Sequence, residues 1–151
     1  MPNKFKTTWI LIADASRARI LKNDGPGLGI DAIDGMMFEG ENRRVQDIMA
    51  DKPGRSYDTA GGGRHAMEYK SDAKHEDERA FAETLISALQ EAHDRKDYDQ
   101  LILIAPPKML GDLRAASPAA LKAVTCAEIN KDLTQIPNGE MADHLKDVLA
   151  V

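Results

Sequence analysis

The residues with the clearest chemical potential lie between positions 51 and 70, around three consecutive glycines. Consecutive glycines allow positive φ angles and let backbone N–H groups approach an anion such as a phosphodiester. Arginine side chains can hold a phosphate through two parallel hydrogen bonds, and a histidine, with an ordinary pKa of about 6.5, can exchange protons at neutral pH. The candidate ligand-binding residues are therefore Arg55, Gly61, Gly62, Gly63, Arg64 and His65.

A second interpretation of the same glycines is structural, because a loop that only needs flexibility is also rich in glycine. The segment matches neither of two common phosphate-binding motifs. No Gly-Lys-Ser or Gly-Lys-Thr follows the glycines, as a Walker loop requires. A long loop rather than a strand is predicted before them, which argues against a dinucleotide-binding fingerprint. Anion binding and simple flexibility both stay open on the sequence alone.

Metal chemistry has little support in the spacing of the potential ligands. Asp14 follows the first predicted strand, where ribonuclease-H-like nucleases carry a metal-binding carboxylate, but we expect it to cap a turn. Cys126 is the only cysteine, which excludes an internal disulfide and a cysteine-based zinc site. We expect Cys126 to be buried in a strand and inert. No two histidines are spaced four residues apart, so we predict no metal and no cofactor.

Two further places carry an open choice. Arg17 and Arg19 alternate along the second predicted strand, where a solvated face is the default and a small RNA-contacting strip is the alternative. The stretch Ala105–Pro107 ends a predicted parallel strand, and ligands of open α/β sheets bind at such ends, near the switch in topology. Its structural interpretation is the rigid start of a helix, since proline suits the first helical position.

The elements that must position these residues alternate between strands and helices. Buried apolar runs and polar-apolar alternation predict strands at residues 8–13, 17–21, 30–38, 101–104 and 125–129. Apolar residues at helical spacing predict helices at about 71–93, 108–115, 117–124 and 138–149. Ser71 or Asp72 is expected to cap the first of these helices, after the glycine-rich loop at 51–70, and Asn138 the last.

This order predicts a three-layer α/β domain with a five-stranded mixed sheet, of the ribonuclease-H-like type. An antiparallel meander comes first and is followed by alternating helices and strands. The predicted strand order is 3-2-1-4-5 with strand 2 antiparallel to the rest, as in the ribonuclease-H-like fold. Crossovers between the parallel strands are expected to be right-handed.

Composition limits the class of protein and its partners. A chain of 151 residues that is 42% hydrophobic and 30% charged suits one globular domain over residues 1–151. A net charge of −5 argues against binding duplex DNA by overall charge, although segment 41–70 is the least acidic part of the chain. The apolar run at 9–13 is too short for a signal peptide or a membrane span, so we expect a cytoplasmic protein without membrane contact.

Five stretches taken together carry a family resemblance. They are WILIADASRARIL (9–21), DKPGRSYDTAGGGRHAME (51–68), RAFAETL (79–85), LILIAPPKMLGDLR (101–114) and KDLTQIPNGEMADHL (131–145). They resemble the bacterial family of proteins required for attachment to host cells. That family is distantly similar to the central domain of archaeal and eukaryotic peptide-chain release factors. In that domain a Gly-Gly-Gln loop, between an antiparallel meander and a long helix, positions water on peptidyl-tRNA.

The resemblance implies a translation-related domain that binds RNA, with the ribosome or a tRNA end as partner. Gly61–Gly63 match the place of the family's loop, but Arg64 and His65 stand where the glutamine would be. The codon-reading domain also has no counterpart in these residues, so autonomous stop-codon-directed release is not implied. If the protein is an enzyme, the resemblance implies a hydrolase acting on an ester or phosphodiester of RNA. The alternative is a non-catalytic interaction or regulatory protein whose effect on attachment is indirect.

Overall fold

The computed structural model describes the backbone of residues 6–40 and 62–149, and the side chains of 6–40 and 72–149. The described strands are β1 (Thr8–Ala13), β2 (Arg17–Asn23), β3 (Asp31–Glu39), β4 (Gln100–Ala105) and β5 (Thr125–Asn130). The described helices are α2 (Gly62–Asp94), α3 (Pro107–Ala116), α4 (Ala119–Val124) and α5 (Met141–Leu145), with a short 3₁₀ helix η1 (Asn138–Glu140) before α5.

The five strands form one mixed sheet in the order β3-β2-β1-β4-β5, which confirms the predicted order. β2 is antiparallel to both of its neighbours, whereas β1, β4 and β5 are parallel. β1 and β4 lie at the centre because their sequences, TWILIA and QLILIA, are apolar on both faces. In the edge strand β3, Gly35 has a φ of +77°, which only glycine adopts at little cost, and the pairing with β2 shifts register nearby.

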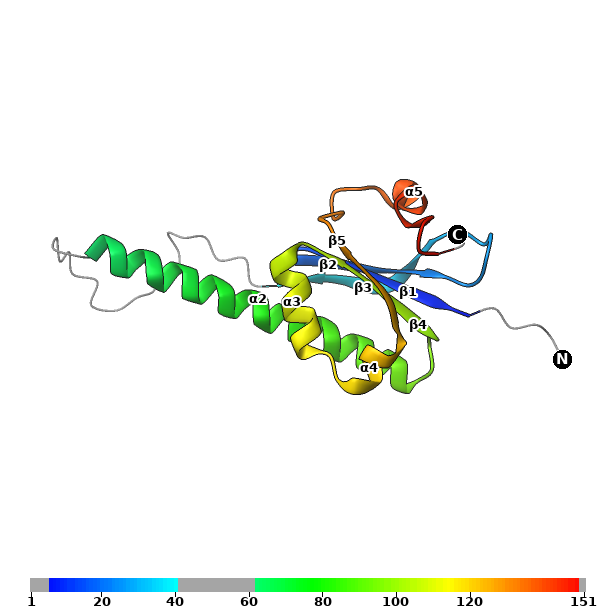
Figure 1. The fold of residues 1–151 in the computed structure, drawn as a ribbon, viewed down its shortest axis with the longest axis horizontal. Helices are drawn as coiled ribbons and strands as arrows, with labels where there is room; N and C mark the ends of the chain where they lie inside the picture. The colour runs from blue at the N-terminus through cyan, green and yellow to red at the C-terminus, as the bar shows by residue number, and fades with distance from the viewer. Residues whose placement is uncertain (1–5, 41–61, 150–151) are drawn as a thin grey trace.

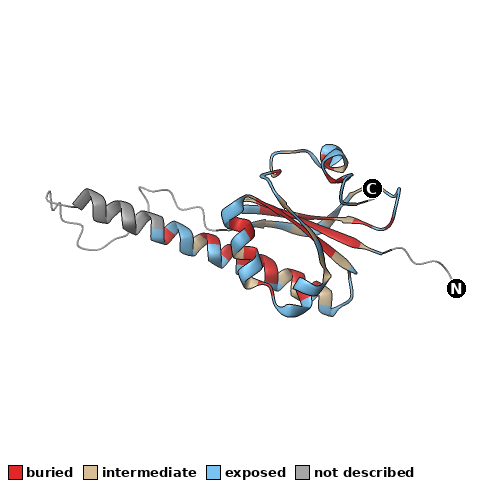
Figure 2. Cartoon of the chain, viewed as in Figure 1, coloured by how far each residue is buried: buried red, intermediate tan, exposed pale blue. Residues whose placement is uncertain are grey.

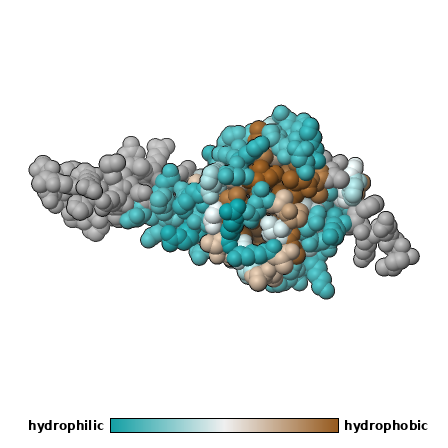
Figure 3. Space-filling view, viewed as in Figure 1, coloured by the Kyte–Doolittle hydropathy of each residue, from teal (hydrophilic) through white to brown (hydrophobic). Residues whose placement is uncertain are grey.

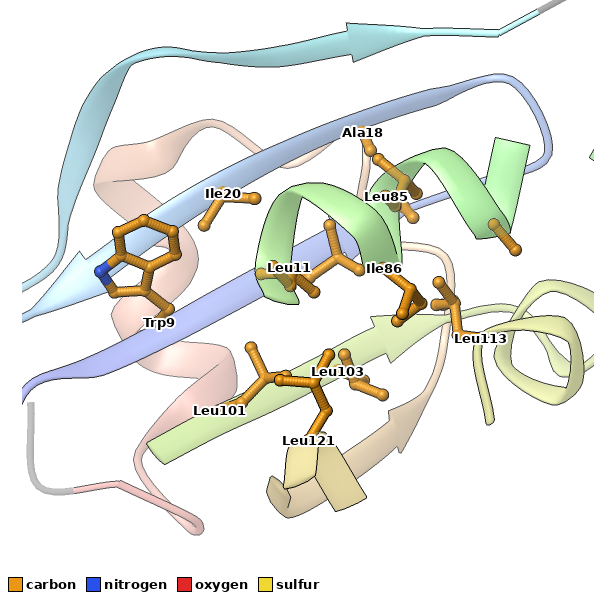
Figure 4. Close-up of a cluster of buried hydrophobic side chains, with 14 of the residues drawn as sticks. Trp9, Leu11, Ala18, Ile20, Leu85, Ile86, Leu101, Leu103, Leu113 and Leu121 are labelled. Carbon is orange, nitrogen blue, oxygen red and sulfur yellow. The ribbon is translucent and has the colours of Figure 1, made fainter. Parts of the chain in front are cut away.

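Each face of the sheet has its own hydrophobic core, and the two faces are covered unequally. Helices α2, α3 and α4 pack on one face, and the segment after β5, with η1 and α5, covers the other (Figure 1). Alternate residues of β1 enter opposite cores, since successive side chains of a strand point to opposite faces. Figure 4 shows the helical side, where Leu11 and Leu103 of the sheet meet Leu85 of α2 and Leu113 of α3.

The second core is the thinner one. It joins Ile10, Ile12 and Ile104 of the sheet to Met141 and Leu145 of α5. Figure 3 shows hydrophobic side chains reaching the surface between this C-terminal segment and the sheet, below α5 in that view. The burial of Met141 and Leu145 on one face confirms the predicted stripe, but the helix itself ends at Leu145 rather than near Leu149. Asn138 provides no side-chain cap, because it is already the first residue of η1.

Helix α2 is the largest departure from the predicted elements. It begins at Gly62, so Ser71 and Asp72 lie inside the helix and residues 62–70 are helical rather than part of a loop. Glycine disfavours helix interiors by about 1 kcal/mol, but Gly62 and Gly63 stand at the helix end, and good helix formers such as Met67 follow.

The two halves of α2 have different surroundings. The C-terminal half buries Phe81, Leu85 and Leu89, which confirms the predicted stripe. The N-terminal half extends beyond the sheet and the other helices (Figures 1 and 2). With 33 residues, the whole helix is about 50 Å long. No helix among the described residues has a stretch both long and apolar enough to cross a membrane.

Candidate functional site

Four of the six predicted ligand-binding residues fall within the described backbone. Gly62, Gly63, Arg64 and His65 form the first turn of α2, at the helix end that stands furthest from the sheet (Figure 1). Arg55 and Gly61 lie outside the described residues. The role of these residues in ligand binding therefore stays a prediction.

The topology of the sheet marks a second place, at the carboxyl ends of β1 and β4. These strands are parallel neighbours, but the chain leaves β1 toward β2 on one side and leaves β4 through α3 and α4 toward β5 on the other. Open α/β sheets bind ligands where the connections diverge in this way. The sequence placed Ala105–Pro107 at such an end, and the structure confirms that β4 ends at Ala105 and that Pro107 begins α3.

A pocket of about 430 Å³ opens at this point on the helical side of the sheet, and we name it the switch-point pocket. Three elements meet there: the turn after β1, the middle of α2 and the start of α3. Its lining residues are Ala15, Lys74, His75, Glu78, Pro106, Lys108 and Met109. Positions 74, 75 and 78 share one side of α2 because residues three and four apart are neighbours on a helix.

Charge in the switch-point pocket is arranged around Glu78. This carboxylate is only 7% exposed, and its Oε2 lies 3.7 Å from Nζ of Lys108. The same Nζ lies 2.5 Å from Oδ2 of Asp112, so Lys108 is held between two carboxylates. Lys74 and His75 are exposed, and Lys74 forms no ion pair with any residue that the structure describes. Lys108 is therefore already paired with two carboxylates, and among the described residues of this lining Lys74 is the cation left for an anionic ligand.

Lys74, His75 and Glu78 were not among the site residues predicted from the sequence. The signal that points to Glu78 is its position, since it precedes Phe81, Ala82 and Leu85 at helical spacing and so continues the apolar stripe. A carboxylate in an apolar stripe is buried and needs a cation, which Lys108 of α3 supplies. That partner is distant in sequence and becomes visible only in the folded chain.

Asp14 caps the turn between β1 and β2, as predicted. Its Oδ1 accepts hydrogen bonds from the backbone N–H groups of Ser16 (2.9 Å) and Arg17 (2.7 Å). Its Oδ2 lies 3.1 Å from the hydroxyl oxygen of Thr134, which ties the turn to the chain after β5. Within residues 6–40 and 72–149, no three histidine, cysteine, aspartate or glutamate side chains come together in a way that suits a metal ion.

The default prediction of a solvated face holds for Arg17 but is wrong for Arg19. Arg17 is exposed, whereas the Arg19 guanidinium is partly buried and donates hydrogen bonds to the carbonyl oxygens of Thr134 (2.9 Å) and Ile136. Arg19 therefore anchors the C-terminal segment to the sheet and does not form an RNA-contacting strip with Arg17. The sequence gives no sign of this, because both acceptors lie more than 100 residues away.

The predicted burial of Cys126 is also wrong. β5 is an edge strand, and its side chains alternate between partly buried and exposed, with Cys126 on the exposed side. Partial desolvation raises the pKa of its thiol, and the positive charge of Lys6 opposes that shift. The thiol is therefore protonated at neutral pH, which makes it a poor nucleophile although it is accessible.

One known protein family matches nearly the whole chain. The model of a protein family described as "Protein required for attachment to host cells" matches residues 9–145. The match runs from the second residue of β1 to the end of α5 and so includes α2 and the switch-point pocket. No curated protein sequence gives a significant match.

Proposed function

We propose that this chain, which belongs to the family of proteins required for attachment to host cells, binds an RNA-containing partner, the ribosome or a tRNA end. The first turn of α2, with Gly62, Gly63, Arg64 and His65, would make the contact. The observation that carries the proposal is the projection of this helix end from the body of the domain (Figure 1).

The projection supports the proposal through geometry. Gly62 stands about 18 Å along the helix axis from Lys74, the first residue of α2 that lines the switch-point pocket. A helix held at one end by a packed core can carry its other end into a groove of a much larger partner. The first N–H groups of a helix have no acceptors within the helix, and the helix dipole favours a phosphate there.

The switch-point pocket offers a second contact for the same partner. Lys74 and His75 are exposed at its rim, on the same helix as the proposed contact. Asp72 and Glu76 fall on the opposite side of α2 by helical spacing, whereas Asp77 and Glu78, three and four residues after Lys74, lie on its side and offset part of its charge. For an RNA strand that follows α2, Lys74 would therefore add a weaker contact than the first turn.

Any hydrolysis in this proposal uses water held by backbone and side chains of the first turn, not a covalent nucleophile. The bond broken would be an ester or phosphodiester of RNA. A cytoplasmic location belongs to the same proposal, because ribosomes and tRNA are found there.

Co-sedimentation with purified ribosomes tests the proposal. Arg64→Ala is expected to weaken co-sedimentation at least about tenfold, since a hydrogen bond to a charged group contributes about 1.5–3 kcal/mol. Gly62→Val is expected to weaken it as well, because a branched side chain hinders the approach of a phosphate to the first N–H groups. Arg79→Ala is the matched control, because Arg79 is an exposed arginine on the packed half of the same helix. The melting temperature should change by less than about 2 °C in all three variants. Unchanged co-sedimentation of Arg64→Ala would refute the proposed contact.

A second experiment separates RNA from protein partners. The tagged chain is recovered from cells with and without ribonuclease treatment, and the bound material is identified. Loss of the bound partners on treatment supports an RNA-containing target. Partners that are purely protein and insensitive to ribonuclease would instead favour the regulatory alternative.

A further inference from the structure

A second pocket lies on the other face of the sheet, away from α2. Its volume is about 470 Å³, which is in the range of small-molecule sites. Its lining residues are Ile12, Arg17, Ala18, Arg19, Met37, Phe38, Glu39 and Thr134. They come from the end of β1, the start of β2, the end of β3 and the chain after β5. We name this cavity the arginine pocket.

The arginine pocket contains two guanidinium groups, of Arg17 and Arg19, that form no ion pair within residues 6–40 and 72–149. Two nitrogens of Arg19 donate to neutral carbonyl oxygens, and its Nε is buried without a hydrogen-bond partner. Burial also lowers the pKa of Arg19, so desolvation already works against its charge. A partly desolvated guanidinium without a carboxylate partner favours an anion from solution.

The other charged groups around the arginine pocket determine how much negative charge the bound anion can carry. Glu39 is opposite Arg17 in the pairing of β2 with β3, so the lining carries two positive charges and one negative charge. The carboxylates of Asp14 and Asp132 lie beside the lining residue Thr134 and accept hydrogen bonds from neutral N–H and O–H groups, so they keep their negative charge and weigh further against a multiply charged anion. The balance of +1 in the lining suits a single carboxylate better than a doubly charged phosphate.

The apolar residues of the lining favour a ligand that has an apolar portion. Ile12 is fully buried under the pocket, and Met37 of the edge strand is 80% exposed. A single exposed apolar side chain is common on protein surfaces, but Met37 lines the pocket, and methionine adapts its shape to varied ligands. Covering Met37 would remove apolar surface from water.

We propose that the arginine pocket binds a small organic monoanion, with its carboxylate against Arg17 and Arg19 and a compact apolar body against Met37. The ligand enters from the sheet face opposite α2. This site is therefore separate from the proposed RNA contact, and either one can exist without the other.

Titration of the ¹⁵N-labelled full chain, followed by NMR, tests the proposal with benzoate as the probe. Benzyl alcohol has the same ring without the charge, and acetate has the charge without the ring. Benzoate is expected to give saturating shifts at the amides of Arg19, Met37 and Thr134, with a Kd at least tenfold lower than that of either control. Phenyl phosphate, which is doubly charged at pH 7.5, is expected to bind more weakly than benzoate. Non-saturating shifts for benzoate, or tighter binding of phenyl phosphate, would overturn the proposal.

Two variants locate the binding. Arg17→Ala should raise the benzoate Kd about tenfold, and Met37→Ser about threefold. Arg79→Ala and Leu28→Ser are the controls, since Leu28 is an exposed apolar residue (58%) outside the pocket lining. Arg17 is preferred to Arg19 because removal of Arg19 would also release the C-terminal segment. An unchanged Kd in both test variants would refute the site, and unchanged ribosome co-sedimentation of Arg17→Ala would keep this result separate from the proposed RNA contact.

Discussion

The close approach of β3 to α2 at Gly40 provides the most direct test of how the long helix is fixed to the sheet. A Cβ atom added at Gly40 would lie 2.7 Å from Cδ1 and 2.8 Å from Cγ of Phe81. Ordinary contacts of a Cβ lie at 3.4–4 Å, so one side must move by more than half an ångström. Phe81 is only 4% exposed within the core, and the Gly40 N–H donates to the carbonyl oxygen of Ser16 at 2.8 Å. Neither side is therefore free to move.

Two effects lower the free energy of unfolding of Gly40→Ala, and one raises it. Overpacking of a closed core costs about 1–3 kcal/mol, and weakening the hydrogen bond to Ser16 adds up to about 1 kcal/mol. The reduced freedom of the unfolded chain stabilises the variant by about 0.4–1 kcal/mol. We expect a net loss of about 1–3 kcal/mol in the free energy of unfolding, which lowers the melting temperature by roughly 2–10 °C.

Urea and thermal unfolding, followed by circular dichroism, measure this effect. Gly111→Ala is the matched control because nothing lies within 4 Å of its added Cβ in α3, and we expect it to stabilise the protein by about 0.5–1 kcal/mol. Gly40→Ala should cost less in a Phe81→Ala background than in the parent chain, since alanine removes Cγ and Cδ1 and leaves only the Cβ at 3.1 Å. If Gly40→Ala is as stable as the parent chain, the described packing of Phe81 against β3 is incorrect.

Two further predictions concern Asp14 and Tyr98. Asp14→Ala should lower the free energy of unfolding by about 1–3 kcal/mol, because the N–H groups of Ser16 and Arg17 lose their acceptor. Asp14→Asn should cost less. Equal stability of Asp14→Ala and the parent chain in a thermal melt would contradict the capping role. Burial, followed by the charges of Asp94 and Asp97, raises the pKa of Tyr98. The folded state therefore holds this proton to higher pH than the unfolded state, whose tyrosine titrates near 10, so stability falls as pH rises above about 10. At pH 8, Tyr98→Phe should lower the free energy of unfolding by about 1 kcal/mol, because the 2.7 Å hydrogen bond to the Leu89 carbonyl is removed. Between pH 8 and 10.5, urea unfolding should show a smaller decline of this free energy in the variant than in the parent chain. Identical declines would refute this role of Tyr98.

The sheet could be predicted from the sequence because its signals are local. β1 and β4 are continuous apolar runs, and short turns connect β1, β2 and β3, so the meander and the central parallel pair follow from patterning. The start of α2 could not be predicted in this way. Gly62 and Gly63 were predicted to be loop residues, because a single sequence does not distinguish a glycine at the end of a helix from a glycine in a loop.

The candidate sites depended on contacts between distant parts of the chain. The prediction for Pro106 and Pro107 succeeded because the carboxyl end of a parallel strand is defined by topology alone. Glu78 and Lys108 were missed because their pairing joins α2 to α3. Arg19 was assigned to solvent because the carbonyl groups that receive its hydrogen bonds follow β5, at the far end of the sequence.

The continuity of α2 has a mechanical consequence. The helix is one hydrogen-bonded rod, with Phe81, Leu85 and Leu89 packed in the core, and its backbone before Ala73 extends beyond the sheet (Figure 1). A sideways load on the first turn would act on a lever held at these three side chains. Such a load would reach the Glu78–Lys108 ion pair first, since Glu78 lies between the first turn and the packed side chains. Binding of a partner at the first turn of α2 would thus change the geometry of this ion pair, at the carboxyl edge of the sheet, without any change in the strands themselves.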